Sequence, residues 1–263
     1  MGKMPHIQLD ESIRATAAIL PGDPGRVDAI AAFLEDVKEE GFHREYKAVT
    51  GTYKGRRILA ISTGMGGPST AICVEELADL GVAQMIRIGS CGALQKDLRL
   101  GELVVCDKAI CDDGTSQTYL DYFRYADPQF NKQHGERKTE GEICYSYADP
   151  KLVQKCLKAC DKLGFDNQAG TARSHDALYL KYKGELDEFY SERGAHASDM
   201  ETAALFAVGS VRKVSTCSIL NVVVEWKKDI KEGVGSYAEG EDRAAEGERN
   251  EILAALEALT MSE

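Results

Sequence analysis

The hydrophobic residues of this chain fall into short runs that alternate with amphipathic segments. The amphipathic segments carry apolar residues three and four positions apart, which is the spacing of one helix face. The short runs have the length and composition of buried strands. This alternation predicts an α/β protein with a mainly parallel sheet flanked by helices. The predicted strands cover residues 17–20, 46–53, 57–63, 84–88, 102–106, 168–173 and 215–224, and the predicted helices cover residues 26–34, 69–80, 150–163, 184–193, 201–211 and 250–259.

Two long segments show neither pattern. Residues 112–149 are polar and aromatic without periodicity, and we expect a functional loop or an irregular insertion there. Residues 227–247 are charged and rich in glycine, which predicts a mobile loop. Either segment could act as a lid over a bound ligand. We find no internal repeat and no linker-like stretch, so residues 1–263 are expected to form a single domain.

Composition narrows the classes of function. The 263 residues carry a formal net charge of −11, which argues against a nucleic-acid or anionic-membrane partner but not against a small anion. The N-terminus has no signal-like segment and no apolar run approaches the ~18 residues of a membrane span, so we expect a cytoplasmic protein. The eight cysteines lack paired C-x-x-C spacing and are expected to be buried, reduced thiols rather than metal ligands.

Two glycine-containing segments each place an arginine at the end of a predicted strand. The first glycine turn, residues 21–26, reads PGDPGR and follows the strand at 17–20. The second, residues 87–92, reads RIGSCG and ends the strand at 84–88. Ligands of α/β proteins bind at the C-terminal ends of parallel strands. Backbone N–H groups, small side chains and guanidinium groups in such turns bind oxyanions such as phosphate.

The second turn indicates a site more strongly than the first. Arg87 lies inside an apolar strand, where an unpaired guanidinium is costly, so it needs an anionic partner. The first turn could equally be a strand–helix connection capped by Asp23, with Arg26 in solvent.

Other polar positions admit a structural and a functional interpretation. The two acids of residues 199–201 (DME) can cap a helix, or Glu201 can bind the vicinal hydroxyls of a ribose. His175 and Asp176 can form an acid–base pair or a structural pair. Arg44, which precedes a strand, can be a solvated edge charge or part of a site.

Taken in order, several segments resemble the nucleoside phosphorylases of the uridine phosphorylase and hexameric purine nucleoside phosphorylase type. The resemblance spans nearly the whole chain and implies an α/β fold, in one domain, with a central mixed β-sheet flanked by helices. It rests on PGDPGRV (21–27), HREY (43–46), STGMGGPSTAICVEEL (62–77), RIGSCGAL (87–94), DGTS (113–116) and SDMETAAL (198–205).

The resemblance also implies roles for individual residues. Arg87 and Glu201 would carry the chemistry, with phosphate as co-substrate and neither cofactor nor metal. Arg44 would enter the phosphate site, and His6 the ribose 5′-hydroxyl site, of a neighbouring subunit, which implies a homodimer or a trimer of dimers with shared active sites. The implied phosphate ligands are Gly22, Arg26, Arg44, Arg87 and Ser90, and the implied ribose ligands are His6, Met200 and Glu201.

The base-binding half departs from both branches of the family. Uridine phosphorylases read uracil with a Gln-x-Arg pair, which residues 178–184 lack, and Leu178 aligns with a base-packing phenylalanine. Purine enzymes use an aspartate after the strand that matches 218–224; here Glu225 could replace it, or Val223 could occupy its position. The candidate base-binding residues are Cys91, Gly92, Leu178, Tyr179 and Glu225.

Three hypotheses for function follow. The first is a nucleoside phosphorylase, closest to uridine phosphorylases, with purine nucleosides as the near alternative. The second is a nucleosidase of the same fold that uses water, which the arginines disfavour because hydrolysis needs no anion clamp. The third is a nucleoside-binding protein without turnover, which is suggested by the departures of the base-binding residues from the family pattern.

Overall fold

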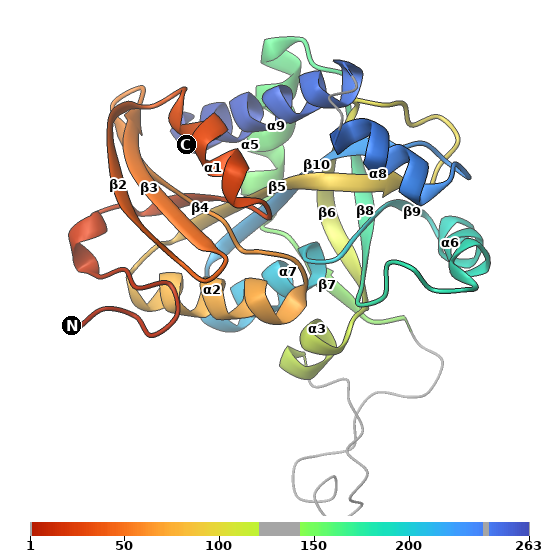
Figure 1. Cartoon of the computed structure of the whole chain (residues 1–263), viewed down its shortest axis with the longest axis horizontal. Helices are drawn as coiled ribbons and strands as arrows, with labels where there is room; N and C mark the ends of the chain where they lie inside the picture. The colour runs from red at the N-terminus through yellow and green to blue at the C-terminus, as the bar shows by residue number, and fades with distance from the viewer. Residues whose placement is uncertain (1, 121–142, 239–241, 263) are drawn as a thin grey trace, which may run out of the picture.

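A computed structural model describes residues 2–120, 143–238 and 242–262 as a twisted ten-stranded sheet with helices on both faces (Figure 1). The strands are β1 (Ala17–Pro21), β2 (Glu35–His43), β3 (Tyr46–Tyr53), β4 (Arg56–Ile61), β5 (Gln84–Ala93), β6 (Leu103–Asp112), β7 (Tyr145–Tyr147), β8 (Asn167–His175), β9 (Ala195–Asp199) and β10 (Ser215–Val224). The helices are α1 (Pro24–Ala31), α2 (Gly67–Asp79), α3 (Gly114–Tyr119), α5 (Pro150–Leu163), α6 (Lys183–Ser191), α7 (Thr202–Arg212), α8 (Ile230–Ala238) and α9 (Asp242–Thr260), with a 3-10 turn at Glu11–Ile13.

The sheet is mixed, as the family resemblance implies, and not mainly parallel, as the periodicity alone predicts. Strand β5 runs parallel to β1 on one side and to β10 on the other, whereas β10 and β6 are antiparallel. Strands β8 and β9 complete a ring, because β9 pairs with the end of β5. A meander of β4, β3 and β2 extends the sheet beyond β1. Periodicity marks strands but carries no information on their direction.

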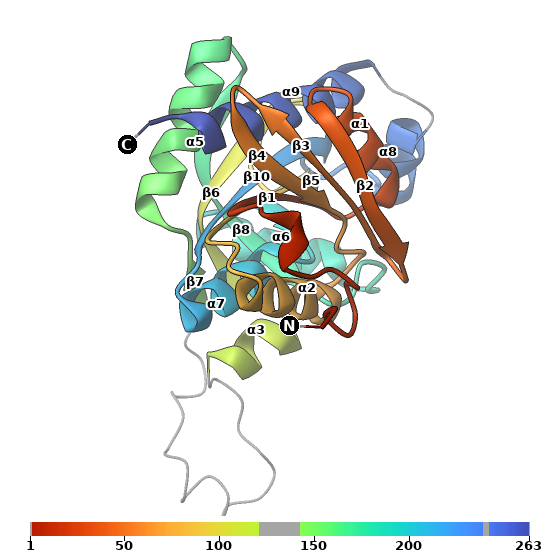
Figure 2. The same ribbon diagram turned by 90° about the vertical axis from the view of Figure 1, so that its left-hand side faces the viewer.

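Two helical layers enclose the sheet (Figures 1 and 2). Helices α2 and α7 pack on one face with α3 beside them, and α5 and α9 pack on the other. The centre of the sheet is apolar on both sides, since Met85, Ile86 and Ile88 of β5 are fully buried. Burial on both faces explains why these strands read as continuous hydrophobic runs.

Several predicted elements are confirmed at their predicted bounds. Strands β3 and β10 and helix α5 coincide with the sequence prediction. Helix α5 has clear local signals: Asp149 accepts a hydrogen bond from the N–H of Leu152 at 2.9 Å, and Gly164 ends the helix in the left-handed conformation.

The prediction of a mobile loop at residues 227–247 is wrong. Helix α8 and the start of α9 lie there, so α9 begins at Asp242 rather than at residue 250. Ile230 and Tyr237 pack against Val223 and Val224 of β10, and this small apolar cluster stabilises a helix that composition alone disfavours. In the segment 112–149, the described residues form α3 and β7, and residues 121–142 lie outside the described part of the chain.

Three local predictions also need correction. Residues 87–92 are not a turn, because β5 continues to Ala93 while its glycines pair with β10. Helix α2 begins at Gly67 and ends at Asp79, so it starts two residues before the predicted helix at 69–80. Strand β2 has no apolar alternation, because all but one of its residues are exposed at the sheet edge, and the sequence pattern therefore missed it.

The structure also bears on composition-based expectations. All eight cysteines are free and buried. No helix in the described part of the chain is both long and apolar enough to cross a membrane. Within the same residues, no cluster of His, Cys, Asp or Glu is placed to hold a metal ion.

Candidate active site

The residues of the two glycine segments meet at one large pocket. The pocket has a volume of about 1050 Å³ and lies where β1, β5, β8, β9 and β10 end. We call the part of the pocket around Arg26, Arg87 and Glu201 the arginine end. We call the part around His175, Leu178, Ile230 and Val234 the apolar end. The predicted site residues that line the pocket are Gly22, Arg26, Arg87, Ser90, Cys91, Gly92, Leu178, Met200 and Glu201.

Arg87 lies at the centre of the arginine end. It sits on β5 between Leu20 of β1 and Ser218 of β10, and is only 4% exposed. Its Nε donates to Asp199 Oδ2 at 3.1 Å and its Nη2 to Glu201 Oε2 at 2.5 Å. Its Nη1 has no hydrogen-bond partner in the described residues, so one buried nitrogen is left for a ligand.

Two glycines make room for this guanidinium. A Cβ at Gly89 would lie 2.7 Å from Arg87 Nη2, so any larger residue would displace the side chain. A Cβ at Gly22 would lie 3.2 Å from the carbonyl oxygen of Gly64 and 4.0 Å from Arg87 Nη1. The first glycine turn therefore approaches the unpaired nitrogen of Arg87 through its backbone.

The sequence left open whether the two acids of residues 199–201 cap a helix or bind a ligand, and the structure separates them. Asp199 caps α7, because its Oδ2 accepts from Thr202 N at 3.0 Å and from Thr202 Oγ1 at 2.6 Å. Its Oδ1 accepts from Ser174 Oγ at 2.5 Å. Asp199 thus ties β8, β9 and α7 to Arg87, and acts as a positioning residue.

Like Asp199, Glu201 lines the pocket. It precedes α7 but its side chain makes no capping bond. Its Oε1 instead accepts from Gly66 N at 2.6 Å, and its Oε2 from Arg87. Burial raises its pKa, and Arg87 opposes that shift. A carboxylate has several lone pairs, so Glu201 can still accept hydrogen bonds from ligand hydroxyls.

Arg26 is buried, so the alternative of a solvated arginine is wrong. Asp23 does cap α1, accepting from Gly25 N at 2.8 Å. The Arg26 side chain is 6% exposed and contacts α8 and α9. Its Nη2 donates to Tyr237 Oη at 2.5 Å and lies 3.0 Å from Glu248 Oε2, and its Nη1 lies 3.1 Å from Glu251 Oε1.

These features agree with comparisons to known proteins. Residues 16–259 match the family model described as the phosphorylase superfamily. The chain belongs to this superfamily. The resemblance to nucleoside phosphorylases of the uridine and purine type is thereby confirmed, together with the mixed-sheet α/β fold.

The similar proteins include both purine-nucleoside and uridine phosphorylases. The chain is 31% identical to a guanosine phosphorylase from Halorubrum lacusprofundi, covering 99% of both chains. It is 35% identical to a uridine phosphorylase from Treponema pallidum, covering 83% of this chain and 81% of the relative. A crystal structure of uridine phosphorylase from Vibrio fischeri superimposes with a TM-score of 0.83 at 34% identity, covering 98% of both chains.

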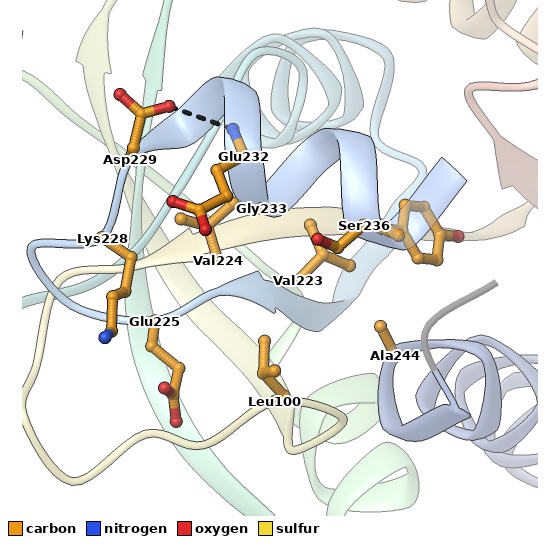
Figure 3. A pocket seen from close by; sticks show the side chains of 11 residues that line it. Leu100, Val223, Val224, Glu225, Lys228, Asp229, Glu232, Gly233, Ser236 and Ala244 are labelled. Atoms are coloured by element: carbon orange, nitrogen blue, oxygen red, sulfur yellow. Dashed lines mark hydrogen bonds between the residues drawn. The ribbon is translucent and has the colours of Figure 1, made fainter. Parts of the chain in front are cut away.

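In this phosphorylase the apolar end contains only part of the predicted base-binding set. Cys91, Gly92 and Leu178 line the pocket. Tyr179 is 66% exposed and Glu225 lies outside the pocket. Glu225 lines a smaller neighbouring cavity of about 250 Å³ beneath α8, whose wall is drawn in Figure 3.

His6 and Arg44 lie outside the pocket of their own chain. His6 is bound to the buried Glu76, with Nδ1 2.6 Å from Oε1. Its carbonyl oxygen lies 2.8 Å from Nδ1 of His43, the residue next to Arg44. Arg44 itself is exposed at the β2–β3 turn. The two residues therefore share one surface.

Sequence reasoning left the role of His175 open and missed several other pocket residues. His175 is 4% exposed and lines the apolar end, with Nε2 3.1 Å from Ser198 Oγ and Nδ1 unpaired in the described residues. Burial lowers its pKa, so the imidazole is neutral at pH 7. Asp176 accepts from Gly114 N at 2.8 Å and has no hydrogen bond to His175, so these two residues form neither the acid–base pair nor the structural pair. Tyr237 and Glu248 line the pocket, and Glu251 lies behind it. None of them carried a sequence signal, because they lie in, next to or just after the segment interpreted as a loop.

Proposed function

We propose that this phosphorylase cleaves a nucleoside with phosphate, giving a free base and ribose 1-phosphate. The observation that carries the proposal is the hydrogen bond from Arg87 Nη2 to Glu201 Oε2 at 2.5 Å. It joins an anion-binding group and a hydroxyl-binding group side by side at one end of a pocket. The adjacent glycine turn supplies close backbone approach.

Phosphate would occupy the arginine end. Gly22, Arg26, Arg87 and Ser90 all line it, and Arg87 offers an unpaired nitrogen. Guanidinium groups bind phosphate oxygens with charge-assisted hydrogen bonds. Water would not need two buried cations, so phosphorolysis is favoured over hydrolysis.

Ribose would lie beside the phosphate on Glu201 and Met200. A phosphate oxygen attacks C1′ while the C1′–N bond breaks, and its electron pair leaves with the base, which takes up a proton. The bound phosphate stabilises the positive charge that develops at C1′, and Glu201 holds the sugar so that attack is in line.

We also propose that two chains share each active site. His6 and Arg44 are adjacent on one surface and outside their own pocket. This placement suits residues that act in a neighbouring subunit. We expect a homodimer or a trimer of dimers, and the mass of the protein in solution tests it.

The base is proposed to be uracil, with purines as the second candidate. The similarity to a uridine phosphorylase structure supports the first, and the similarity to a guanosine phosphorylase over the full chain supports the second. At the apolar end, the neutral His175 and Ser198 can hydrogen-bond a base edge, and Leu178 can pack against its ring.

A substrate panel tests the proposal. Uridine, thymidine, inosine, guanosine and adenosine are incubated with the protein, with and without phosphate, and free base is measured. Phosphate-dependent cleavage is the expected result and identifies the base. Cleavage without phosphate would show a nucleosidase, and binding without cleavage a nucleoside-binding protein.

A further inference from the structure

Two carboxylates from α9 contact Arg26 from different sides. Glu248 and Glu251 are three positions apart on the helix and approach Nη2 and Nη1 of Arg26 at 3.0 and 3.1 Å. Glu248 lines the pocket, together with Tyr237 of α8, whereas Glu251 does not. One carboxylate therefore covers the pocket side of the guanidinium, and the other supports it from behind.

The pocket-side contact is closed by a second hydrogen bond. Tyr237 accepts from Arg26 Nη2 at 2.5 Å and donates to the carboxylate of Glu248. We call Tyr237 and Glu248 the Arg26 cap. The Glu248 side chain is 29% exposed, so it can rotate into solvent and regain full hydration.

The contact between Glu251 and Arg26 cannot open by rotation into solvent. Glu251 is 0% exposed, and its Oε2 accepts from Gly89 N at 3.1 Å. Gly89 is the residue that leaves room for Arg87. Glu251 thus connects the two arginine-bearing segments, and moving it would leave a buried charge without a partner.

Charge makes the cap and phosphate competitors. Arg26 and Arg87 already face four carboxylates, those of Asp199, Glu201, Glu248 and Glu251. A phosphate dianion that approaches Arg26 from the pocket meets the Glu248 carboxylate on the same nitrogen. Two negative groups that contact the same nitrogen, here the phosphate and the Glu248 carboxylate, repel each other strongly where water is excluded.

We propose that phosphate binds by displacing the Arg26 cap, while Glu251 stays in place as a positioning residue for Arg26 and β5. The proposal rests on the proposed function, because it assigns phosphate to the arginine end. Glu248 then sets the affinity for phosphate by occupying its place in the free protein.

The cap also links phosphate to the apolar end. Tyr237 lies on α8, and Ile230 and Val234 of the same helix line the apolar part of the pocket. When phosphate releases Tyr237, α8 loses its contact with Arg26. Phosphate and nucleoside should therefore alter each other's binding by the same factor.

The matched variants Glu248→Gln and Glu251→Gln test the proposal. Phosphate binding is measured by calorimetry on the full chain, without nucleoside. Glu248→Gln should bind phosphate about threefold to fivefold more tightly than wild type, which is the magnitude of a partly exposed ion pair. Glu251→Gln should bind it about tenfold more weakly, because the buried support of Arg26 is lost. Tyr237→Phe keeps the ring and should also tighten binding.

Unchanged or weaker phosphate binding by Glu248→Gln, with an unaltered melting temperature, would overturn the cap. So would tighter binding by Glu251→Gln, since that would make Glu251 a competitor rather than a support. A wild-type protein that binds phosphate but cleaves no nucleoside in its presence would instead refute the proposed function and leave the cap standing.

Discussion

At the arginine end of the pocket both buried arginines contact carboxylates, whereas at the apolar end the buried His175 contacts a hydroxyl and has one ring nitrogen without a partner among the described residues. Arg87 and Arg26 contact carboxylates from β9, from the residue before α7 and from α9 at 2.5 to 3.1 Å. The one hydrogen-bond partner of the His175 ring within the described residues is Ser198 Oγ, 3.1 Å from Nε2. A strong, directional charge network is needed where charge develops in the reaction, while base selection can depend on shape and a few polar atoms.

The largest expected effect is at Arg87. Arg87→Ala should lower kcat/KM for phosphate by about 10³-fold, because it removes the central cation of the arginine end. Steady-state kinetics over a wide range of phosphate concentration measures this. Circular dichroism controls for folding, since the change also leaves two buried carboxylates without their partner. Wild-type activity at ordinary phosphate would contradict the assignment of the arginine end.

A stability experiment probes the buried charge on α9. Burial raises the pKa of Glu251 to about 7, above its ordinary value of 4.5. The folded protein thus holds this proton more tightly than the unfolded chain, so the stabilising contribution is complete below about pH 4.5 and is lost as pH rises through about 7. The loss is on the order of 3 kcal/mol.

Glu251→Gln cannot titrate and should lack this loss. Relative to wild type, its free energy of unfolding should increase between about pH 5 and 8, as measured by denaturant titration at each pH. Glu248→Gln is the matched control. Parallel pH curves for wild type and Glu251→Gln would show that Glu251 does not titrate in this range.

A substitution at Glu201 tests the proposed ribose-binding role of this carboxylate at the arginine end. Glu201→Gln keeps an acceptor for Gly66 N but loses the charge beside Arg87, so kcat/KM for the nucleoside should fall about 100-fold with little change in melting temperature. A variant that unfolds while its residual activity per folded molecule is normal would instead assign Glu201 a purely structural role.

The smallest effect is expected at the apolar end. His175→Ala should change the ratio of kcat/KM between the best and second-best nucleoside by about tenfold and leave KM for phosphate unchanged. Ser198→Ala, which removes only the neighbour of the imidazole, should have a weaker effect in the same direction. An equal loss for every nucleoside would argue that His175 supports the fold rather than the choice of base.

The local sequence pattern was enough to predict several residues of the candidate site. The apolar runs predicted the central strands, and an arginine within such a run indicated a buried anion partner, which is what Arg87 has. The DME segment indicated a cap or a ligand carboxylate, and the structure uses Asp199 for one and offers Glu201 for the other. These features are readable because strand burial, helix capping and the cost of a buried charge act within a few residues.

Contacts between distant segments could not be predicted in this way. Tyr237 meets Arg26 across 211 positions of the chain, and Glu251 meets Gly89 across 162. Both contacts depend on the neighbouring positions of β1 and β5 in the sheet, on the packing of α9 against both strands, and on the packing of α8 against β10. The sequence by itself therefore determined that Arg87 needs an anionic partner, and it left open whether Arg26 is buried or in solvent. Only the tertiary structure decided which carboxylates contact the two arginines, because strand order and helix packing, not local pattern, bring them together.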